Sequence, residues 1–204
     1  MSSRTEQNRP PFDSVCVYCG SSNLAPPALT AAATHLGEAI ARQGLRLVYG
    51  GGGVGLMGAC ARAARDAGGA VLGVIPQFLT GYEHPLPDVE TLIVGSMHQR
   101  KMRMFEEADA FIVLPGAIGT LEEAIELISW RRLGLHAKPI VFYNPDGFWD
   151  PLFALFHQFI DTRLVPPDFE ESWRSVETIA EAVPTLRSMA HGALAAAPGL
   201  GAVT

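Results

Sequence analysis

The sequence alternates short apolar runs with longer segments of helical pattern, and this alternation limits the possible folds more than any other feature. The runs are rich in valine and isoleucine without strict polar alternation, which is typical of strands buried on both faces. We expect strands at Ser14–Tyr18, Leu45–Tyr49, Ala70–Ile75, Thr91–Val94, Ala110–Leu114 and Pro139–Tyr143. Helices are predicted at Pro27–Gln43, Leu56–Ala67, Met97–Glu107, Ile118–Leu133, Phe148–Thr162 and Val176–Met189. The pattern predicts an α/β fold, a Rossmann-like doubly wound parallel sheet with helices on both faces.

No linker or internal repeat divides the chain. It has 204 residues, 48% of them hydrophobic, which is enough to bury a substantial core. We expect a single domain at residues 13–189. Residues 1–12 and 190–204 are predicted to be flexible tails, because neither end has a periodic apolar face.

Charge and cysteine content narrow the possible partners and location. The net charge of −6 disfavours binding to nucleic acid or to an anionic membrane surface. No apolar stretch approaches the roughly 20 residues of a membrane span. The cysteines Cys16, Cys19 and Cys60 cannot form a disulfide framework. Because the N-terminus also lacks a signal peptide, we expect a cytoplasmic protein. Cys16 and Cys19 lack the second cysteine pair of a zinc site. We therefore interpret them as core residues and expect no metal.

Three loops that would follow strands are rich in glycine or other small residues. They are Gly20–Ser22, with Ser21 at its centre, Gly50–Gly58 and Pro115–Thr120. In a doubly wound sheet, ligands bind beyond the carboxyl ends of the strands. Glycine lets the backbone approach a ligand closely, and the free N–H groups at a helix start favour an anion. The loops therefore predict a ligand that carries phosphate.

The second loop contains a GxGxxG match at residues 53–58. A dinucleotide-binding fingerprint also needs an acidic residue about 20 positions later. Here the residues around Phe78 and Leu79 are apolar and the next acid is Glu83, and the loop follows the second strand, so NAD binding is not favoured. No Lys-Ser/Thr pair follows Gly55, which excludes a Walker A loop. Four consecutive glycines exceed what a turn needs. We therefore interpret Gly51, Gly52 and Gly53 as ligand contacts.

A basic segment at residues 96–103 precedes the strand that leads into the third loop. Ser96 can cap a helix, and Arg100 and Arg103, three positions apart, would project together. Such a segment is often only a solvated basic face. Its place directly before the third loop favours a role in the site.

The third loop passes into a helix with two acids near its start. Backbone N–H groups between Gly116 and Thr120 could hold a phosphate, with the Thr120 hydroxyl as a further donor. Glu122 has the simpler interpretation of an acid that complements the helix dipole. Glu123 is the better candidate for acid–base chemistry, because its neighbours on the helix surface are apolar.

This helix has two apolar sides. One stripe consists of Leu121, Ala124, Ile125 and Ile128. Glu123 lies on another side, with Leu127 and Trp130 four and seven positions later. A helix that is apolar on two sides is typically buried on two sides, which favours a subunit interface. Apolar neighbours also disfavour the charged form of Glu123 and predict a raised pKa, as an acid–base residue often requires.

The segments Gly50–Gly58, Ser96–Lys101 and Pro115–Glu123 together resemble the "lonely guy" family of cytokinin riboside 5′-monophosphate phosphoribohydrolases, long mislabelled as lysine decarboxylases. The resemblance extends from about Val15 to Ile160. It implies a Rossmann-like homodimer that hydrolyses the N-glycosidic bond of N6-modified AMP. The implied products are the free base and ribose 5-phosphate, and neither a metal nor an organic cofactor is required.

The resemblance also implies roles for individual residues. The catalytic arginine of the family falls on Arg100 and its catalytic glutamate on Glu123, while Glu83 falls on a glutamate on the base side. Positions that contact the nucleotide fall on Lys101, Ser129 and the loop residues Ala117, Ile118, Gly119, Thr120, Leu121 and Glu122. The family pattern has a second glycine where this chain has Ala117. If that position needs positive φ, the alanine is strained by ~1 kcal/mol or more.

The chemistry suits these residues, and other functions stay open. A carboxylate stabilises the oxocarbenium character that develops on the ribose and can activate water, while an arginine can orient the phosphoribosyl group. A general AMP nucleosidase would use the same residues. A non-catalytic nucleotide or molybdenum-cofactor binding protein would share the glycine loops. A pyridoxal-phosphate lysine decarboxylase would need a Schiff-base lysine, and the chain has only Lys101 and Lys138.

Overall fold

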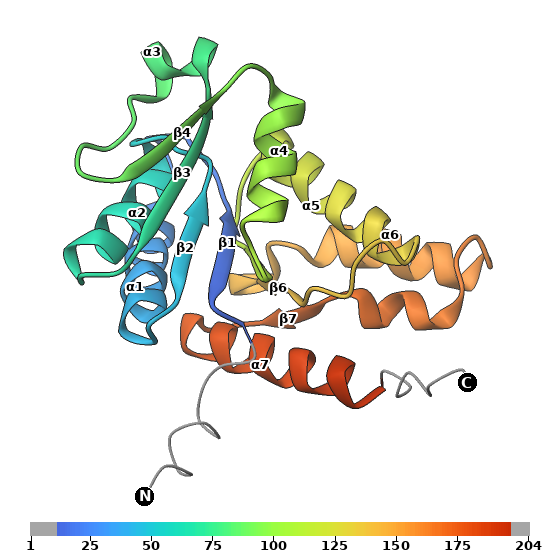
Figure 1. Ribbon diagram of the computed structural model, residues 1–204. Coiled ribbons are helices and arrows are strands. Elements are labelled where there is room, and N and C mark those ends of the chain that lie inside the picture. The colour runs from blue at the N-terminus through green and yellow to red at the C-terminus, as the bar shows by residue number, and fades with distance from the viewer. Residues whose placement is uncertain (1–11, 197–204) are drawn as a thin grey trace, which may run out of the picture.

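The computed structural model describes residues 12–196, and its strands form one seven-stranded parallel sheet in the order β4-β3-β2-β1-β5-β6-β7 (Figure 1). The strands are β1 Ser14–Tyr18, β2 Arg46–Tyr49, β3 Val71–Pro76, β4 Glu90–Val94, β5 Ala110–Val113, β6 Ile140–Tyr143 and β7 Arg174–Val176. The α-helices are α1 Pro27–Arg42, α2 Gly55–Asp66, α3 Thr80–Glu83, α4 Met97–Glu106, α5 Ile118–Arg132, α6 Asp150–Asp161 and α7 Ile179–Ala196. Short 3₁₀ helices are η2 Gln77–Leu79, η3 Pro145–Gly147 and η4 Pro167–Ser172.

Each face of the sheet has its own hydrophobic core. On one face α1, α2 and α7 pack against the strands, with Leu36 of α1 among the buried residues that surround Val17. On the other face α4, α5 and α6 do the same, with Leu127 of α5 in the core that contains Phe111. Successive side chains of a strand point to opposite faces, so the central strands need apolar residues at every position. The predicted fold class is confirmed.

The cysteines take part in these two cores. All three are buried free thiols. Cys16 belongs to the core under α4 and α5, whereas Cys19 and Cys60 belong to the core under α1 and α2. Cys16 and Cys19 thus lie on opposite faces of the sheet, which confirms that they are core residues.

The predicted strands agree with the structure to within one residue at each end, but the final strand was missed. β7 occupies Arg174–Val176, and its last residue was predicted to start a helix. α7 starts instead at Ile179 and continues to Ala196, so it enters the segment that was predicted to be a tail. Phe12, also assigned to a tail, is 5% exposed and belongs to the first core. The rest of both predicted tails lies outside the described residues.

The single sheet bears on domain organisation. Because every strand in the described part of the chain joins that sheet, we propose that residues 13–189 form one domain. Among residues 12–196, no helix combines the length and the apolar character that crossing a bilayer would require.

The strand order fixes where a ligand can bind. From β1 the chain builds outward through β2, β3 and β4 on one side and through β5, β6 and β7 on the other. Connections from β1 and β5 therefore leave the sheet in opposite directions and open a crevice beyond their carboxyl ends. The loops that follow these two strands are two of the three loops predicted to bind a ligand. The main-chain N–H of Gly20 donates to the Pro115 carbonyl at 3.2 Å and ties them together.

Candidate active site

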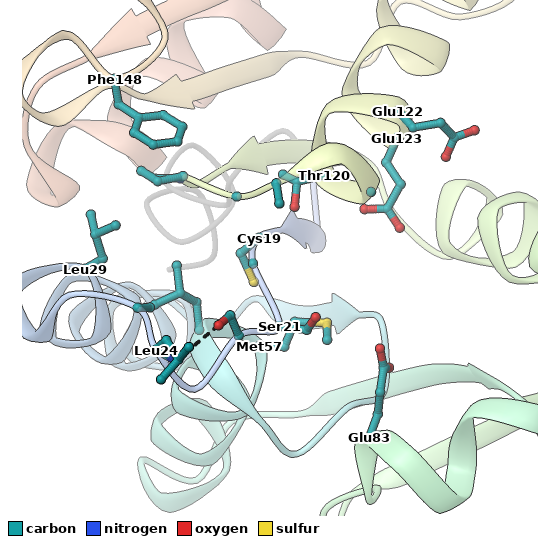
Figure 2. A pocket seen from close by; sticks show the side chains of 18 of the residues that line it. Cys19, Ser21, Leu24, Leu29, Met57, Glu83, Thr120, Glu122, Glu123 and Phe148 are labelled. Carbon is teal, nitrogen blue, oxygen red and sulfur yellow. Dashed lines mark hydrogen bonds between the residues drawn. The ribbon is translucent and has the colours of Figure 1, made fainter.

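A cavity of about 470 Å³ lies in this crevice. The loops after β1 and β5, the start of α2, and side chains from α3, α4 and α5 line it (Figure 2). Most of the predicted site residues meet here. Those that line the cavity are Ser21, Glu83, Arg100, Gly116, Ala117, Gly119, Thr120, Glu122 and Glu123.

Arg100 enters the cavity from α4 with a side chain only 7% exposed. Its Nη2 donates to the Gly50 carbonyl at 2.8 Å and lies 3.8 Å from Oε2 of Glu83. The sulfur atoms of Met57 and Met97 lie 4.0 and 3.9 Å from the two terminal nitrogens. The Nε atom is buried without a hydrogen-bond partner among the described residues. One edge of the guanidinium is thus fixed, and a buried donor is left for a ligand.

Glycines make room for these charged groups. A Cβ atom at Gly50 would overlap the guanidinium of Arg100, and one at Gly52 would lie 3.0 Å from Oε2 of Glu83. That oxygen is buried and, within residues 12–196, accepts no hydrogen bond. The glycine run therefore serves to seat Arg100 and Glu83 side by side, each with an unsatisfied polar atom.

Glu123 points toward the cavity from the second turn of α5 (Figure 2). Burial raises the pKa of its carboxyl group from 4.5 to about 7. The positive charges of Arg100 and Lys101 oppose the shift, and the negative charges of Glu122 and Glu83 add to it. The pKa predicted from the apolar neighbours of Glu123 is confirmed in direction. A carboxyl group with this pKa exchanges protons readily at neutral pH, as general acid–base chemistry requires.

The start of α5 presents free backbone N–H groups at the cavity. Ala117 is the N-cap residue and provides no side-chain cap, so the first backbone N–H groups of the helix have no intrahelical partner. Gly116, Gly119 and Thr120 line the cavity here. A Cβ atom at Gly116 would overlap the Thr120 side chain, which explains the glycine. Free N–H groups at the positive end of a 15-residue helix favour a phosphate.

Ala117 is not strained. Its φ is −95° and its ψ is −154°, in the extended region open to any L-residue. The strain expected for positive φ at this position does not arise. The family's second glycine is therefore not needed for the backbone conformation seen in this chain.

The GxGxxG match does not form a phosphate cradle. The N–H of Gly53 donates to the carbonyl of Glu83 at 2.7 Å, that of Gly55 donates to Asn23 Oδ1 at 2.9 Å, and that of Leu56 donates to the Gly20 carbonyl at 3.0 Å. These donors are consumed by the protein itself. Within the described part of the chain, the residues that line the cavity do not include the three glycines predicted to contact a ligand, namely Gly51, Gly52 and Gly53.

Four other predicted contact residues also lie away from the cavity lining. Lys101 forms ion pairs with Glu122 and Glu126 of α5. Ile118 is 78% exposed, Leu121 packs against the core under α4 and α5, and Ser129 is exposed on the outer side of α5. The structure thus brings together Arg100, Glu123 and the predicted phosphate loop, Pro115–Thr120. These four residues lie outside the cavity lining.

Comparison with known proteins identifies the family. The family described as "Possible lysine decarboxylase" matches residues 57–186. A probable cytokinin riboside 5′-monophosphate phosphoribohydrolase of Oryza sativa subsp. japonica is 46% identical over 157 residues, which cover 76% of this chain and 69% of the relative. A cytokinin riboside 5′-monophosphate phosphoribohydrolase of Arabidopsis thaliana is 42% identical over 163 residues, which cover 79% and 75%. The chain belongs to this phosphoribohydrolase family. The resemblance seen in the motifs is confirmed.

Solved structures share the fold of this family member at low sequence identity. The molybdenum cofactor carrier protein of Chlamydomonas reinhardtii has a TM-score of 0.65 at 20% identity, covering 86% of this chain and 96% of that one. The molybdenum cofactor binding protein of Rippkaea orientalis has a TM-score of 0.62 at 22% identity, with the same coverage. At such identity the likeness concerns the fold alone.

The lysines of this phosphoribohydrolase family member are unsuited to a Schiff base. Neither Lys101 nor Lys138 lines the cavity. The Lys138 ammonium donates to the carbonyls of Phe105 and Ala108 at 2.6 and 2.7 Å and lies 4.0 Å from the centre of the Phe105 ring. Both lysines bind other groups of the protein: Lys101 pairs with carboxylates of α5, and Lys138 binds carbonyl groups at the end of α4. Residues 12–196 also contain no group of three His, Cys, Asp or Glu side chains that could hold a metal ion.

Sequence reasoning missed the apolar wall of the cavity. It consists of Leu24, Ala25, Leu29, Leu56, Met57, Met97 and Phe148. Phe148 follows a turn in which Asp146 and Gly147 have φ of 50° and 71°. The Asn144 side chain fixes this turn by accepting from the Trp149 N–H at 2.6 Å and donating to Asp150 at 2.8 Å. The only signal in the sequence was the position of these residues in the loops and helix starts that follow strands.

Proposed function

We propose that the protein hydrolyses the N-glycosidic bond of N6-modified AMP, a cytokinin riboside 5′-monophosphate, to the free base and ribose 5-phosphate. The names of the relatives support the reaction, and the chain spans about 69% to 75% of the length of the two described above. The observation that carries the proposal is the meeting of Arg100 and Glu123 in one cavity, beside a helix N-terminus that can hold a phosphate.

The substrate phosphate would bind the start of α5. Backbone N–H groups and the hydroxyl of Thr120 would hold it, with Ser21 across the crevice. This anchor would place the ribose between Arg100 of α4 and Glu123 of α5, since both residues line the cavity. Binding energy at the phosphate would thereby fix the geometry of the sugar–base bond.

Glu123 and Arg100 would divide the chemistry. As the N-glycosidic bond breaks, the electron pair leaves with the base, which takes up a proton from solvent, and positive charge develops on the ribose ring. The ionised carboxylate of Glu123 would stabilise this charge and accept a proton from the attacking water. Arg100, pinned by the Gly50 carbonyl, would donate its free Nε–H to an oxygen of the phosphoribosyl group. Glu83, next to Arg100, would contact the base.

Other chemistries fit the cavity less well. A pyridoxal-phosphate decarboxylase would need a lysine in the cavity, and both lysines of the chain are engaged elsewhere. A carrier protein would need the phosphate anchor and not a carboxyl group with a pKa of about 7. A general AMP nucleosidase would use the same groups, so the substrate comparison below decides between the two hydrolases.

We further propose that the protein is a cytoplasmic homodimer. By helix geometry, Ile118, Ile125 and Leu133 lie on one side of α5, and they are 78%, 37% and 63% exposed. Ile125 was predicted to share one apolar stripe with Ala124 and Ile128, but these two are buried and Ile125 is exposed, so it belongs to the outward side. A second copy would cover such a stripe. Three buried free thiols suit a reducing compartment.

The test is direct. Purified protein is incubated separately with isopentenyl-AMP, AMP and isopentenyladenosine, and the free base is quantified by chromatography. We expect rapid release from isopentenyl-AMP, slower release from AMP and none from the riboside, which lacks the phosphate anchor. Equal rates for AMP and isopentenyl-AMP would favour the general nucleosidase. Binding of both nucleotides without base release would overturn the hydrolase assignment.

A further inference from the structure

Lys101 connects the two helices that carry the proposed catalytic pair. It follows Arg100 on α4, and its side chain is only 14% exposed. The ammonium group is paired with Glu122 and lies 3.1 Å from Glu126 Oε2. The two glutamates are one helical turn apart on α5, so their side chains are neighbours on its surface. A single cation therefore spans a turn of α5 directly beside Glu123.

We propose that Lys101 is a positioning residue for the hydrolytic reaction: by bridging Glu122 and Glu126 it holds α4 against α5 and places a fixed positive charge beside the Glu123 carboxyl group. The inference rests on the proposed function. It replaces the contact with the nucleotide that the sequence predicted for Lys101, because the ammonium is already engaged by two carboxylates and Lys101 itself does not line the cavity.

The charge of Lys101 is permanent at neutral pH. Burial lowers the pKa of its ammonium group, but hydrogen bonds with Glu122 and Glu126 outweigh burial and raise the pKa above 10.5. Glu122 would otherwise present an unneutralised carboxylate next to Glu123. Removal of Lys101 would therefore make ionisation of Glu123 less favourable.

Other charged groups around Glu123 have to be considered for its titration. Arg100 faces it from α4, Glu83 faces it from α3, and Glu122 precedes it on α5. Cys16 and Tyr18 of β1 also interact with it, but burial raises the pKa of both side chains well above neutrality, so they stay uncharged. Near pH 7, Lys101 is thus the positively charged group whose removal changes the charge beside Glu123 without touching Arg100.

The chain offers a matched control at the far end of the same helix. Lys138 donates to the Phe105 and Ala108 carbonyls at the C-terminal end of α4. The His136 ring next to it lies 2.9 Å from the Leu127 carbonyl of α5 and packs edge-on against Phe105. Lys138 thus helps to tie α4 to α5 at a site away from the cavity lining. Lys138→Met weakens the contact between the helices without changing the charges paired with Glu122.

The experiment compares kcat/KM against pH for the wild type, Lys101→Met, Lys101→Arg and Lys138→Met, with isopentenyl-AMP as substrate. We expect the acidic limb of Lys101→Met to move to higher pH by roughly half a unit or more, and kcat to fall about tenfold. Lys101→Arg should restore the limb. Lys138→Met should leave its midpoint in place, whatever its effect on stability. An unshifted limb in Lys101→Met, or an equal shift in Lys138→Met, would overturn the proposal.

A variant with the opposite sign tightens the test. Glu122→Gln removes a negative charge beside Glu123 while Lys101 keeps Glu126, so the acidic limb should move to lower pH. The carboxyl carbon of Glu123, titrated by NMR in the unliganded protein, should show both shifts whether or not the enzyme turns over. A wild type without base release would thus defeat the proposed function, whereas equal Glu123 titrations in wild type and Lys101→Met would defeat the role of Lys101 alone.

Discussion

Glu123 carries the clearest conflict between stability and function at the scale of single residues. Its pKa of about 7 in the folded protein lies above the ordinary value of 4.5, so the folded state binds more protons between these pH values. The free energy of unfolding therefore falls as pH rises from about 4.5 to 7 and stays reduced above it. The proposed reaction needs the ionised carboxylate of Glu123, whereas its burial in the fold favours the protonated form.

Glu123→Gln should make the protein inactive and more stable in alkali. We expect base release to fall at least 10³-fold, in the range reported for lost acid–base and charge-stabilising groups. Relative to the wild type, the variant should gain up to about 3 kcal/mol of unfolding free energy between pH 5 and pH 8, because it has no charge to bury. Urea denaturation at both pH values measures this. Parallel stability curves for the two proteins would contradict the raised pKa.

Two neighbouring positions of the phosphate loop should respond in opposite ways. Gly116→Ala puts a Cβ atom onto the Thr120 side chain and 2.9 Å from the Gly20 nitrogen, so it should displace the loop and cut kcat/KM at least tenfold. Ala117→Gly restores the family pattern, but φ at this position is −95°. It should leave kcat/KM within about twofold and cost about 0.4–1 kcal/mol, because glycine gains freedom in the unfolded chain. A large gain in activity for Ala117→Gly would show that the alanine constrains the loop.

At the scale of elements, we propose that the glycine run after β2 acts as a spacer for neighbouring side chains. The N–H groups of Gly53, Gly55 and Leu56 all donate within the protein. What the run supplies is space, since any side chain at Gly50 would overlap Arg100. The glycine run therefore affects the site through the arginine that it accommodates, while Leu56 and Met57 at the start of α2 line the cavity themselves.

Gly50→Ala should imitate the loss of the arginine. The new methyl group would push the guanidinium from the Gly50 carbonyl, and we expect kcat/KM to fall about 100-fold, approaching the value of Arg100→Ala. Gly81→Ala is the matched control, because nothing lies within 4 Å of a Cβ atom there and its φ is not in the left-handed region. Steady-state rates with isopentenyl-AMP measure both. Equal activity of the two variants would contradict the spacer role.

The elements differ in how far the sequence could predict them. The buried strands β1, β2, β3, β5 and β6 were recognised because apolar residues fill nearly every position on both faces. The edge strand β4 has no buried residue and was recognised from its short apolar run Leu92–Val94. β7 escaped because it has three residues at the edge of the sheet, two of them exposed. α3 is a four-residue helix that ends at Glu83, too short for any period to appear. The family resemblance pointed to Glu83, yet only the fold shows it beside Arg100.

The residues of the site also differ in how far the sequence could predict their surroundings. The start of α5 was predicted because a proline–glycine turn between a strand and a helix leaves free N–H groups whatever the tertiary context. Gly51, Gly52 and Gly53 were assigned to the ligand because sequence alone cannot tell whether backbone donors are used internally. The ion pairs of Lys101 could not be predicted for a related reason: its partner Glu126 lies 25 positions away.

At the scale of the whole molecule, the reversal of strand order explains why the residues with proposed catalytic and binding roles meet in one cavity. β1 and β5 diverge there, and the loops after them face each other across the crevice. Helices α4 and α5, which cover the same face of the sheet, then deliver Arg100 and Glu123 to it (Figure 1). The outer side of α5 is left with exposed apolar residues, beginning with Ile118 beside the phosphate loop.

Assembly should therefore depend on the outer side of α5. A charge at Ile125, at the middle of the stripe, would have to be buried between two copies without a partner, which is costly. We expect Ile125→Arg to sediment as a monomer at micromolar concentration where the wild type sediments as a dimer. Leu164→Arg is the control, because Leu164 is 69% exposed but lies after α6 and outside the stripe.

The same pair of variants tells whether assembly supports catalysis. Ile118 is adjacent to Gly119 and Thr120, so a partner that covers it would also stiffen the phosphate loop. We therefore expect the monomeric Ile125→Arg to show a raised KM for isopentenyl-AMP with a smaller change in kcat, since the lost order affects binding of the phosphate before it affects Glu123. Leu164→Arg should match the wild type in both constants. A monomeric wild type, or a dimeric Ile125→Arg, would remove α5 from the interface.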